Sequence, residues 1–273
     1  MLLLSLSIFN ANPPTVYLYC DHAVAVILPQ IRYLGKIVVR EALDLYSGFP
    51  RSVLESLPGK NLPTRWADFM AEKIYLMNWA FTDAEAGAGG VLFCDADICF
   101  LGPLPSIPEG ALAGLSPHAI RARDEAKFGK YNGGFVWLAG PAMTRIWLEA
   151  CPTAFYFEQS ALEDVAAAAA AAGPGRLYEF PVTQNYGWWR LWQGEKSIGE
   201  LQRLWTMNRA KSPNHAGILI DGEPLGSVHT HFYEKRDGAT ISYNEWVLKW
   251  IEKLAPRHTP AKRLLDILSK RPL

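Results

Sequence analysis

Residues 91–97 read VLFCDAD, a short apolar run followed at once by two aspartates one residue apart. A continuous apolar run of this length is typical of a strand that is buried on both faces of a sheet. In open α/β sheets, ligands bind beyond the carboxyl ends of the strands, which is where Asp95 and Asp97 stand. Two carboxylates in such a turn can supply oxygen ligands to a hard divalent cation, Mg²⁺ or Mn²⁺. The stretch therefore predicts a metal site at the end of a buried strand.

Helical and strand patterns alternate on both sides of this stretch. Apolar residues recur at helical spacing over residues 66–81, directly before the strand. Further patterns predict strands at 16–20, 37–39, 111–115 and 135–138, and helices from 141, over 157–172, near 247–254 and near 264–268. The alternation predicts an α/β fold: one Rossmann-like domain with a mostly parallel central sheet flanked by helices. We expect this domain to span residues 1–255, with a basic helical tail at 256–273.

The composition shows no charge bias. The 27 Lys and Arg residues balance the 27 Asp and Glu residues, which argues against a non-specific nucleic-acid partner. The four cysteines form no CxxC pair, which predicts reduced thiols in a cytoplasmic protein. The apolar start at residues 1–9 has helical spacing and is too short for a membrane span, which needs about 20 residues. The basic, amphipathic tail predicts at most weak peripheral contact with a membrane.

Further polar segments follow the aspartates: YNGGFVWL at 131–138, FEQ at 157–159, FPVTQN at 180–185 and VHTHF at 228–232. In this order, and with Lys73 on the preceding helix, the segments resemble the GT-A glycosyltransferases, the nucleotide-diphospho-sugar transferase superfamily. The resemblance covers about residues 66–246. It implies a metal-dependent enzyme that moves a sugar from a nucleotide-sugar donor to a glycan, a lipid-linked saccharide or a small-molecule acceptor.

The resemblance also implies roles for individual residues. Asp95 and Asp97 would hold Mn²⁺ or Mg²⁺ together with His229 or His231. Alternation places both histidines on one face of a strand at 226–232, and the Phe that follows His231 favours that residue. The other candidates have catalytic or substrate-binding roles: Glu158 and Gln159 at the reacting sugar, and Lys73, His118, Asn132, Gly133, Gly134, Asn185, Trp188 and Trp189 around the substrate. Indole faces stack on sugars, but at least one of the two tryptophans is expected in the core.

The first strand of the family has no clear match: either residues 1–8 are a poorly matching strand, or the chain begins after that strand. Two alternatives stay open. The first is a phosphatase of the haloacid dehalogenase type, in which Asp95 would be the nucleophile. The second is a non-catalytic module that binds a nucleotide sugar or a carbohydrate. Turnover of a generic phosphoester would favour the phosphatase, and binding of a nucleotide sugar without turnover would favour the module.

Overall fold

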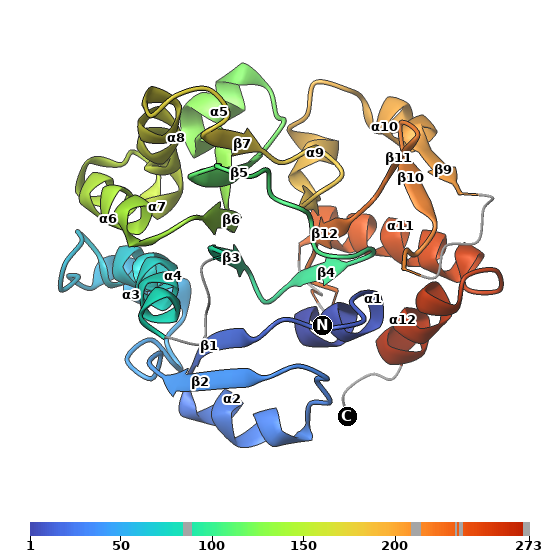
Figure 1. The fold of residues 1–273 in the computed structure, drawn as a ribbon, viewed down its shortest axis with the longest axis horizontal. Coiled ribbons are helices and arrows are strands. Elements are labelled where there is room, and N and C mark those ends of the chain that lie inside the picture. Colours follow the sequence, from blue (N-terminus) through green and yellow to red (C-terminus); the bar gives the residue numbers. More distant parts are fainter. Residues whose placement is uncertain (84–88, 209–213, 233, 235–236, 270–273) are drawn as a thin grey trace.

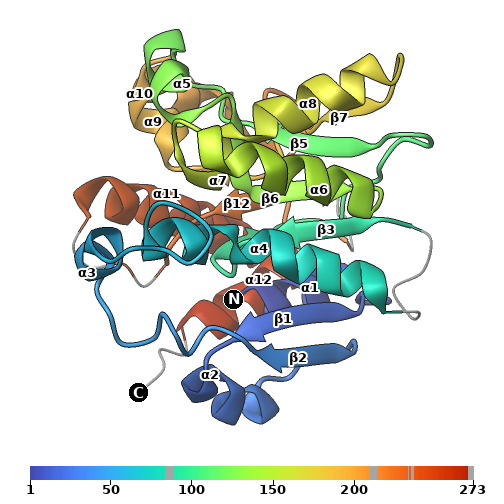
Figure 2. The ribbon, with the colours of Figure 1, turned by 90° about the vertical axis from the view of Figure 1, so that its left-hand side faces the viewer.

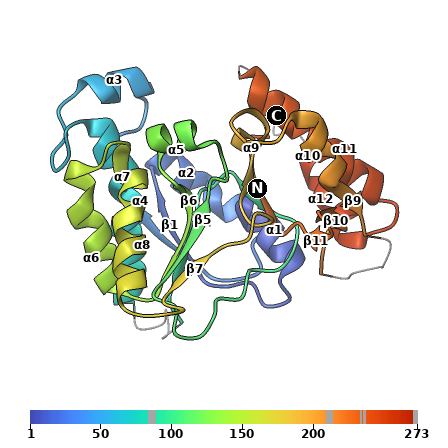
Figure 3. The ribbon, with the colours of Figure 1, turned by 90° about the horizontal axis from the view of Figure 1, so that it is seen from above.

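The protein is described by a computed structural model that covers residues 1–83, 89–208, 214–232, 234 and 237–269. A central sheet lies between two layers of helices (Figure 3). One layer contains α4 (Arg65–Thr82), α6 (Pro141–Ala150) and α8 (Leu162–Ala171). The other contains α1 (Leu2–Phe9), α11 (Gly238–Leu254) and α12 (Thr259–Ser269). The fold is mixed α/β, as the alternating sequence pattern predicts.

The central sheet has the strand order β3-β6-β5-β7. Its members are β3 (Val91–Cys94), β6 (Tyr131–Leu138), β5 (Ala113–Pro117) and β7 (Leu177–Glu179). β6 runs antiparallel to both of its neighbours, and only β5 and β7 pair in parallel. The prediction of a mostly parallel sheet was therefore wrong. An apolar run indicates that both faces of a strand are covered, but it does not give the direction of the neighbouring strand.

β6 shows why both faces of the sheet are apolar. Every residue of this strand is buried, and from Phe135 to Leu138 the side chains alternate between two cores. Phe135 and Trp137 belong to the core that also contains α1, α11 and α12, whereas Val136 and Leu138 pack with α4, α6 and α8. β6 thus packs against both helical layers, and this packing fixes the position of the residues at its ends.

A smaller sheet with the order β4-β12-β8 follows the turn at residues 95–97. It consists of β4 (Ile98–Phe100), β12 (Ser227–His229) and β8 (Tyr186–Gly187). Residues 95–97 form the turn by which the chain leaves β3 and enters β4. The strand predicted at 226–232 is shorter than expected, because β12 ends at His229. His231 therefore lies beyond the paired part of the strand.

The N-terminal part adds a parallel pair, β1 (Val16–Cys20) and β2 (Ile37–Glu41), beside which lies α2 (His22–Ile27) (Figure 2). The remaining elements are short (Figure 1): α3 (Arg51–Ser56), α5 (Ala122–Phe128), α7 (Phe157–Ser160), α9 (Trp189–Trp192), α10 (Ile198–Leu204), β9 (Trp205–Met207), β10 (Ile218–Ile220), β11 (Glu223–Pro224) and the 3₁₀ turns Leu28–Gln30 and Cys151–Thr153. The helix predicted at 157–172 is divided into α7 and α8.

The ends of the chain pack into the same core. The segment expected to be helical at residues 1–9 forms α1, and its Leu6 and Phe9 are buried. On α12, Ala261 and Leu264 are buried in the core that α1 and α11 share, and residues 270–273 lie outside the described part. In the described part of the chain, no helix has the length and apolar character that crossing a bilayer demands.

Candidate functional site

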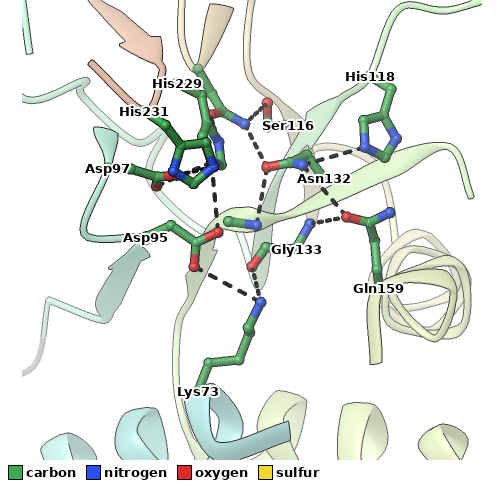
Figure 4. Close-up of polar contacts among 12 residues, drawn as sticks. Lys73, Asp95, Asp97, Ser116, His118, Asn132, Gly133, Gln159, His229 and His231 are labelled. Carbon is green, nitrogen blue, oxygen red and sulfur yellow. Dashed lines mark hydrogen bonds and ion pairs between the residues drawn. The ribbon is translucent and has the colours of Figure 1, made fainter. Parts of the chain in front are cut away.

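Strand pairing brings the two aspartates and one histidine together (Figure 4). The backbone N–H of Asp95 donates to the carbonyl oxygen of Gly134 at 2.9 Å, which continues the β3–β6 ladder. On the other side of the turn, His229 stands opposite Ile98 in the β12–β4 ladder. One ligand atom from each of Asp95, Asp97 and His229 lies within 4.8 Å of the others. Residues far apart in the sequence thus form one cluster of metal-ligand type.

His229 completes this cluster, and His231 does not. The Nε2 atom of His229 lies 3.2 Å from Asp97 Oδ1 and 3.7 Å from Asp95 Oδ2. His231 instead contacts the outer oxygen of Asp97, Oδ2, at 3.0 Å. The His229 side chain is 9% exposed and that of His231 is 57% exposed. The geometry therefore favours His229 over the residue that the following Phe favoured, and a role of His231 at the metal stays a prediction.

The chemistry of the donor set fits a cation. The Nδ1 atom of His229 lies 2.9 Å from Asn185 Oδ1, and an amide oxygen only accepts, so Nδ1 carries the proton. The neutral ring then turns the lone pair of Nε2 toward Asp97 Oδ1. This oxygen is buried and has no hydrogen-bond donor within the described part of the chain. Two acceptors 3.2 Å apart are stabilised only by a cation or a proton between them.

A proton competes with a metal for this place. Burial disfavours the charged imidazole, but Asp97 and Asp95 outweigh burial and raise the pKa of His229. Burial likewise opposes ionisation of Asp97, yet the nearby histidines hold its pKa at about 2. The carboxylate of Asp97 is therefore ionised at neutral pH and can accept positive charge from a cation.

A buried ion pair lies directly behind the cluster. Lys73 on α4 is 8% exposed, and its Nζ lies 2.7 Å from Glu158 Oε1, 3.9 Å from Asp95 Oδ1 and 3.2 Å from the carbonyl oxygen of Gly133. Burial opposes the ammonium charge, but Glu158 and Asp95 outweigh it and raise the pKa of Lys73. Glu158 is 1% exposed and faces Lys73. Its predicted contact with a donor sugar stays a prediction.

Amide side chains form a network around Asn132 and Gly133 of β6. Gln159 Oε1 accepts from the backbone N–H of Gly133 at 3.1 Å, and its Nε2 donates to the carbonyl of Phe128 at 2.7 Å. The Nδ2 atom of Asn132 lies 3.3 Å from His118 Nε2. Burial lowers the pKa of His118 to about 4, so its ring is neutral and Nε2 accepts this bond. Gln159 is half-buried and offers an amide at the edge of the network.

The two adjacent tryptophans differ in exposure. Trp189 is 6% exposed, donates from Nε1 to the carbonyl of His118 at 3.1 Å, and sets its ring at 77° to that of His229, 5.1 Å away. It supports the site from within the core, so its burial does not support stacking on a sugar. Trp188 is half-buried and packs against the same core. Its predicted contact with substrate stays a prediction.

Sequence reasoning missed the role of Arg190. This residue is 4% exposed and donates to the carbonyl oxygens of Pro117, His118 and Val182. Burial lowers the pKa of its guanidinium to about 10. The two bonds to Pro117 and His118 hold the end of β5 against α9 and so fix the position of His118. The sequence shows only a basic residue after two tryptophans, which gives no signal of such a role.

Charge balance around the cluster favours a divalent ion. Asp95, Asp97 and Glu158 contribute carboxylates, Lys73 contributes one ammonium, and His229 is neutral when Nε2 acts as a ligand. With all three carboxylates ionised and His229 neutral, the group carries two net negative charges, and protonation of His229, whose pKa Asp97 and Asp95 raise, leaves one. Charges removed from water are stable only when they are paired, and a dication restores the balance.

No protein-family model matches the chain, and no curated protein matches its sequence. Among solved structures, the fold is similar to that of mouse xyloside xylosyltransferase 1 in its apo form, with 10% sequence identity. The similarity covers 80% of this chain and 84% of that chain, with a TM-score of 0.41. With this identity and TM-score, the similarity supports no conclusion about the activity of the chain.

Proposed function

We propose that the chain is a metal-dependent glycosyltransferase that moves a sugar from a nucleotide-diphosphate sugar to an acceptor. The observation that carries the proposal is the cluster of Asp95, Asp97 and His229 at the end of β3, with ligand atoms within 4.8 Å of one another. The order of the segments that resemble the GT-A enzymes supports the same reading. Mn²⁺ and Mg²⁺ are the cofactors that the two carboxylates favour.

The residues around the cluster suit an anionic donor. A divalent cation held by Asp95, Asp97 and His229 would neutralise the diphosphate of the departing nucleotide, a role worth several kcal/mol in such reactions. Lys73 keeps Asp95 in place with its charge, 3.9 Å from Oδ1. The half-buried Gln159 uses one N–H of its amide on the carbonyl of Phe128, and the second N–H would serve a sugar hydroxyl.

The proposal is tested with a panel of nucleotide sugars in the presence of Mn²⁺, by measuring release of the nucleoside diphosphate with and without simple sugar acceptors. We expect turnover with at least one donor and loss of turnover when the metal is chelated. Asp97→Asn removes the inner carboxylate and should lower turnover at least about 100-fold, because the cation supplies several kcal/mol. Asp164→Asn, an exposed change on α8, is the matched control and should leave turnover unchanged.

The same assays separate the two alternatives. Hydrolysis of p-nitrophenyl phosphate that depends on Asp95, with no turnover of any nucleotide sugar, would replace the proposal with the phosphatase. Saturable binding of a nucleotide sugar without release of nucleoside diphosphate under any acceptor condition would replace it with the binding module. No contact in the described structure favours either alternative over the transferase.

A further inference from the structure

Asn185 is a buried residue with an unusual backbone conformation. It is 0% exposed and has φ +53°, in the left-handed region that few residues other than glycine adopt. Asparagine is among the residues that tolerate this region best. The backbone N–H of Asn185 donates to Ser227 Oγ at 2.8 Å, which anchors the residue beside β12. The chain thus holds an amide side chain at a fixed place directly behind His229.

We propose that Asn132 and Asn185 are positioning residues that lock His229 in one tautomer, so that the unprotonated Nε2 faces the carboxylates. This inference rests on the proposed function, because it assigns the part of the protein that prepares the metal site. Neither asparagine needs to touch the metal. Both act through the hydrogen bond that ends on Nδ1 of His229.

The donor and acceptor of every hydrogen bond between Gly134 and His229 follow from one backbone group. The N–H of Gly134 can only donate, and it lies 3.0 Å from Asn132 Oδ1. The amide nitrogen of Asn185 donates to the same oxygen at 2.9 Å and to Ser116 Oγ at 3.1 Å. The oxygen of Asn185 is therefore left for His229 Nδ1, 2.9 Å away, which must supply the proton. The tautomer of His229 is therefore set by the backbone N–H of Gly134 in β6 and does not require a bound metal.

The far end of the network agrees with this direction. Asn132 turns its amide nitrogen toward His118 Nε2, at 3.3 Å, and toward Gln159 Oε1, at 3.5 Å. His118 Nδ1 lies 2.9 Å from the carbonyl of Gly129 and so carries the proton, which leaves Nε2 as the acceptor. The amide groups are thus satisfied without any reversal. A fully connected polar network of this kind holds a single arrangement.

The other tautomer would remove the ligand. If Nε2 carried the proton, it would donate to Asp97 Oδ1 at 3.2 Å, and this contact would occupy both the histidine and a carboxylate oxygen. Hydrogen bonds from a ligand histidine to a second group fix its ring and raise its basicity, and losing such a partner costs about 10- to 100-fold in metal affinity. In the neutral ring, the bond to Asn185 therefore disfavours the tautomer that would occupy Nε2 with a proton.

The test uses Asn185→Gly, which permits the positive φ but deletes the amide. Ser116→Ala is the matched control, since it removes one acceptor of the amide while Asn132 still fixes its direction. Two quantities are measured: the affinity for Mn²⁺, from the electron paramagnetic resonance signal of free metal, and the tautomer of His229 in the metal-free protein. The tautomer is read from ¹⁵N shifts of labelled histidine above the pH at which this ring loses its first proton, with His229→Asn to assign the signal.

We expect wild type and Ser116→Ala to carry the proton on Nδ1, and Asn185→Gly to shift it toward Nε2 and to bind Mn²⁺ about 10- to 100-fold more weakly. A wild-type His229 that carries its proton on Nε2 would overturn the inference, and this result needs no variant to fold. Unchanged tautomer and affinity in Asn185→Gly would overturn it as well. If wild type keeps the Nδ1 tautomer but binds no Mn²⁺, the metal-dependent function fails while the positioning role of Asn185 stands.

Discussion

Gly134 of β6 lies against Asp95 and His229, and replacing it with alanine tests the geometry of the proposed metal site. A Cβ at this position would lie 2.3 Å from Asp95 Oδ2 and 2.6 Å from Cε1 of His229, whereas ordinary contact begins at 3.4 Å. Gly134 is not among the residues with positive φ, so alanine can adopt its backbone conformation. The effect of Gly134→Ala therefore comes from the two contacts, and the carboxylate must move by about 1 Å.

This displacement is too large for a metal ligand to tolerate. Ligand distances in a competent site vary by only about 0.2 Å, so a shift of about 1 Å removes Asp95 from the coordination sphere. Changes in outer-shell partners alone cost about 10- to 100-fold in affinity, and we therefore expect Gly134→Ala to weaken Mn²⁺ binding by at least about 100-fold. Overpacking should also lower the free energy of unfolding by about 1–3 kcal/mol.

The assay is a titration with Mn²⁺ followed by electron paramagnetic resonance, combined with urea unfolding to show that the variant is folded. Gly199→Ala is the matched control, because no atom lies within 4 Å of a Cβ at that exposed position, and its affinity should equal that of wild type. Mn²⁺ affinity of Gly134→Ala within threefold of wild type would refute the placement of Asp95 and His229 around this glycine.

Three further predictions concern the histidines and the buried ion pair. His229→Ala should abolish Mn²⁺ binding in the same titration, whereas His231→Ala, which removes a side chain that is 57% exposed, should change it less than about tenfold; the reverse order would contradict the assignment. Lys73→Met leaves Glu158 buried without its partner and should cost about 3–5 kcal/mol in urea unfolding, part of which Glu158→Gln restores; a loss below about 1 kcal/mol would contradict the pairing. Burial lowers the pKa of His118 to about 4, so below pH 6.5 the unfolded chain binds more protons than the native one. The free energy of unfolding is therefore unaffected by this group above pH 6.5, and it falls by up to about 3 kcal/mol as the pH approaches 4. In urea unfolding at pH 7 and pH 4.5, His118→Gln should lose less stability than wild type, and equal losses would contradict this reasoning.

The strand and helix that carry the aspartates were predictable from local pattern. The apolar run at 91–94 forms a strand with those bounds, and the helical spacing over 66–81 lies within α4. The direction of pairing was not predictable, because the residues of β6 are buried on both faces by helices whichever way its neighbours run. The break between α7 and α8 at Ala161 was also hidden, since no glycine or proline marks it in the sequence.

The site was predictable as a set of residues but not as an arrangement. The two aspartates, Lys73 and the amide residues lie close together in the fold, as the order of the segments implied. The choice between His229 and His231 required the register of β12, which ends at the first of them. The contact of Asn185 with His229 Nδ1 required the hydrogen-bond network that orients its amide. Such information comes from long-range contacts, which a single sequence does not contain.

The central claim is that a divalent cation held by Asp95, Asp97 and His229 binds the diphosphate of a nucleotide. Calorimetric titration of the protein with nucleoside diphosphates of the common bases, with Mn²⁺ and with a chelator, tests it most directly. We predict that at least one nucleoside diphosphate binds with Mn²⁺ and that chelation or Asp97→Asn abolishes this binding. Binding of equal strength in the chelator, or in Asp97→Asn with Mn²⁺, would contradict the account.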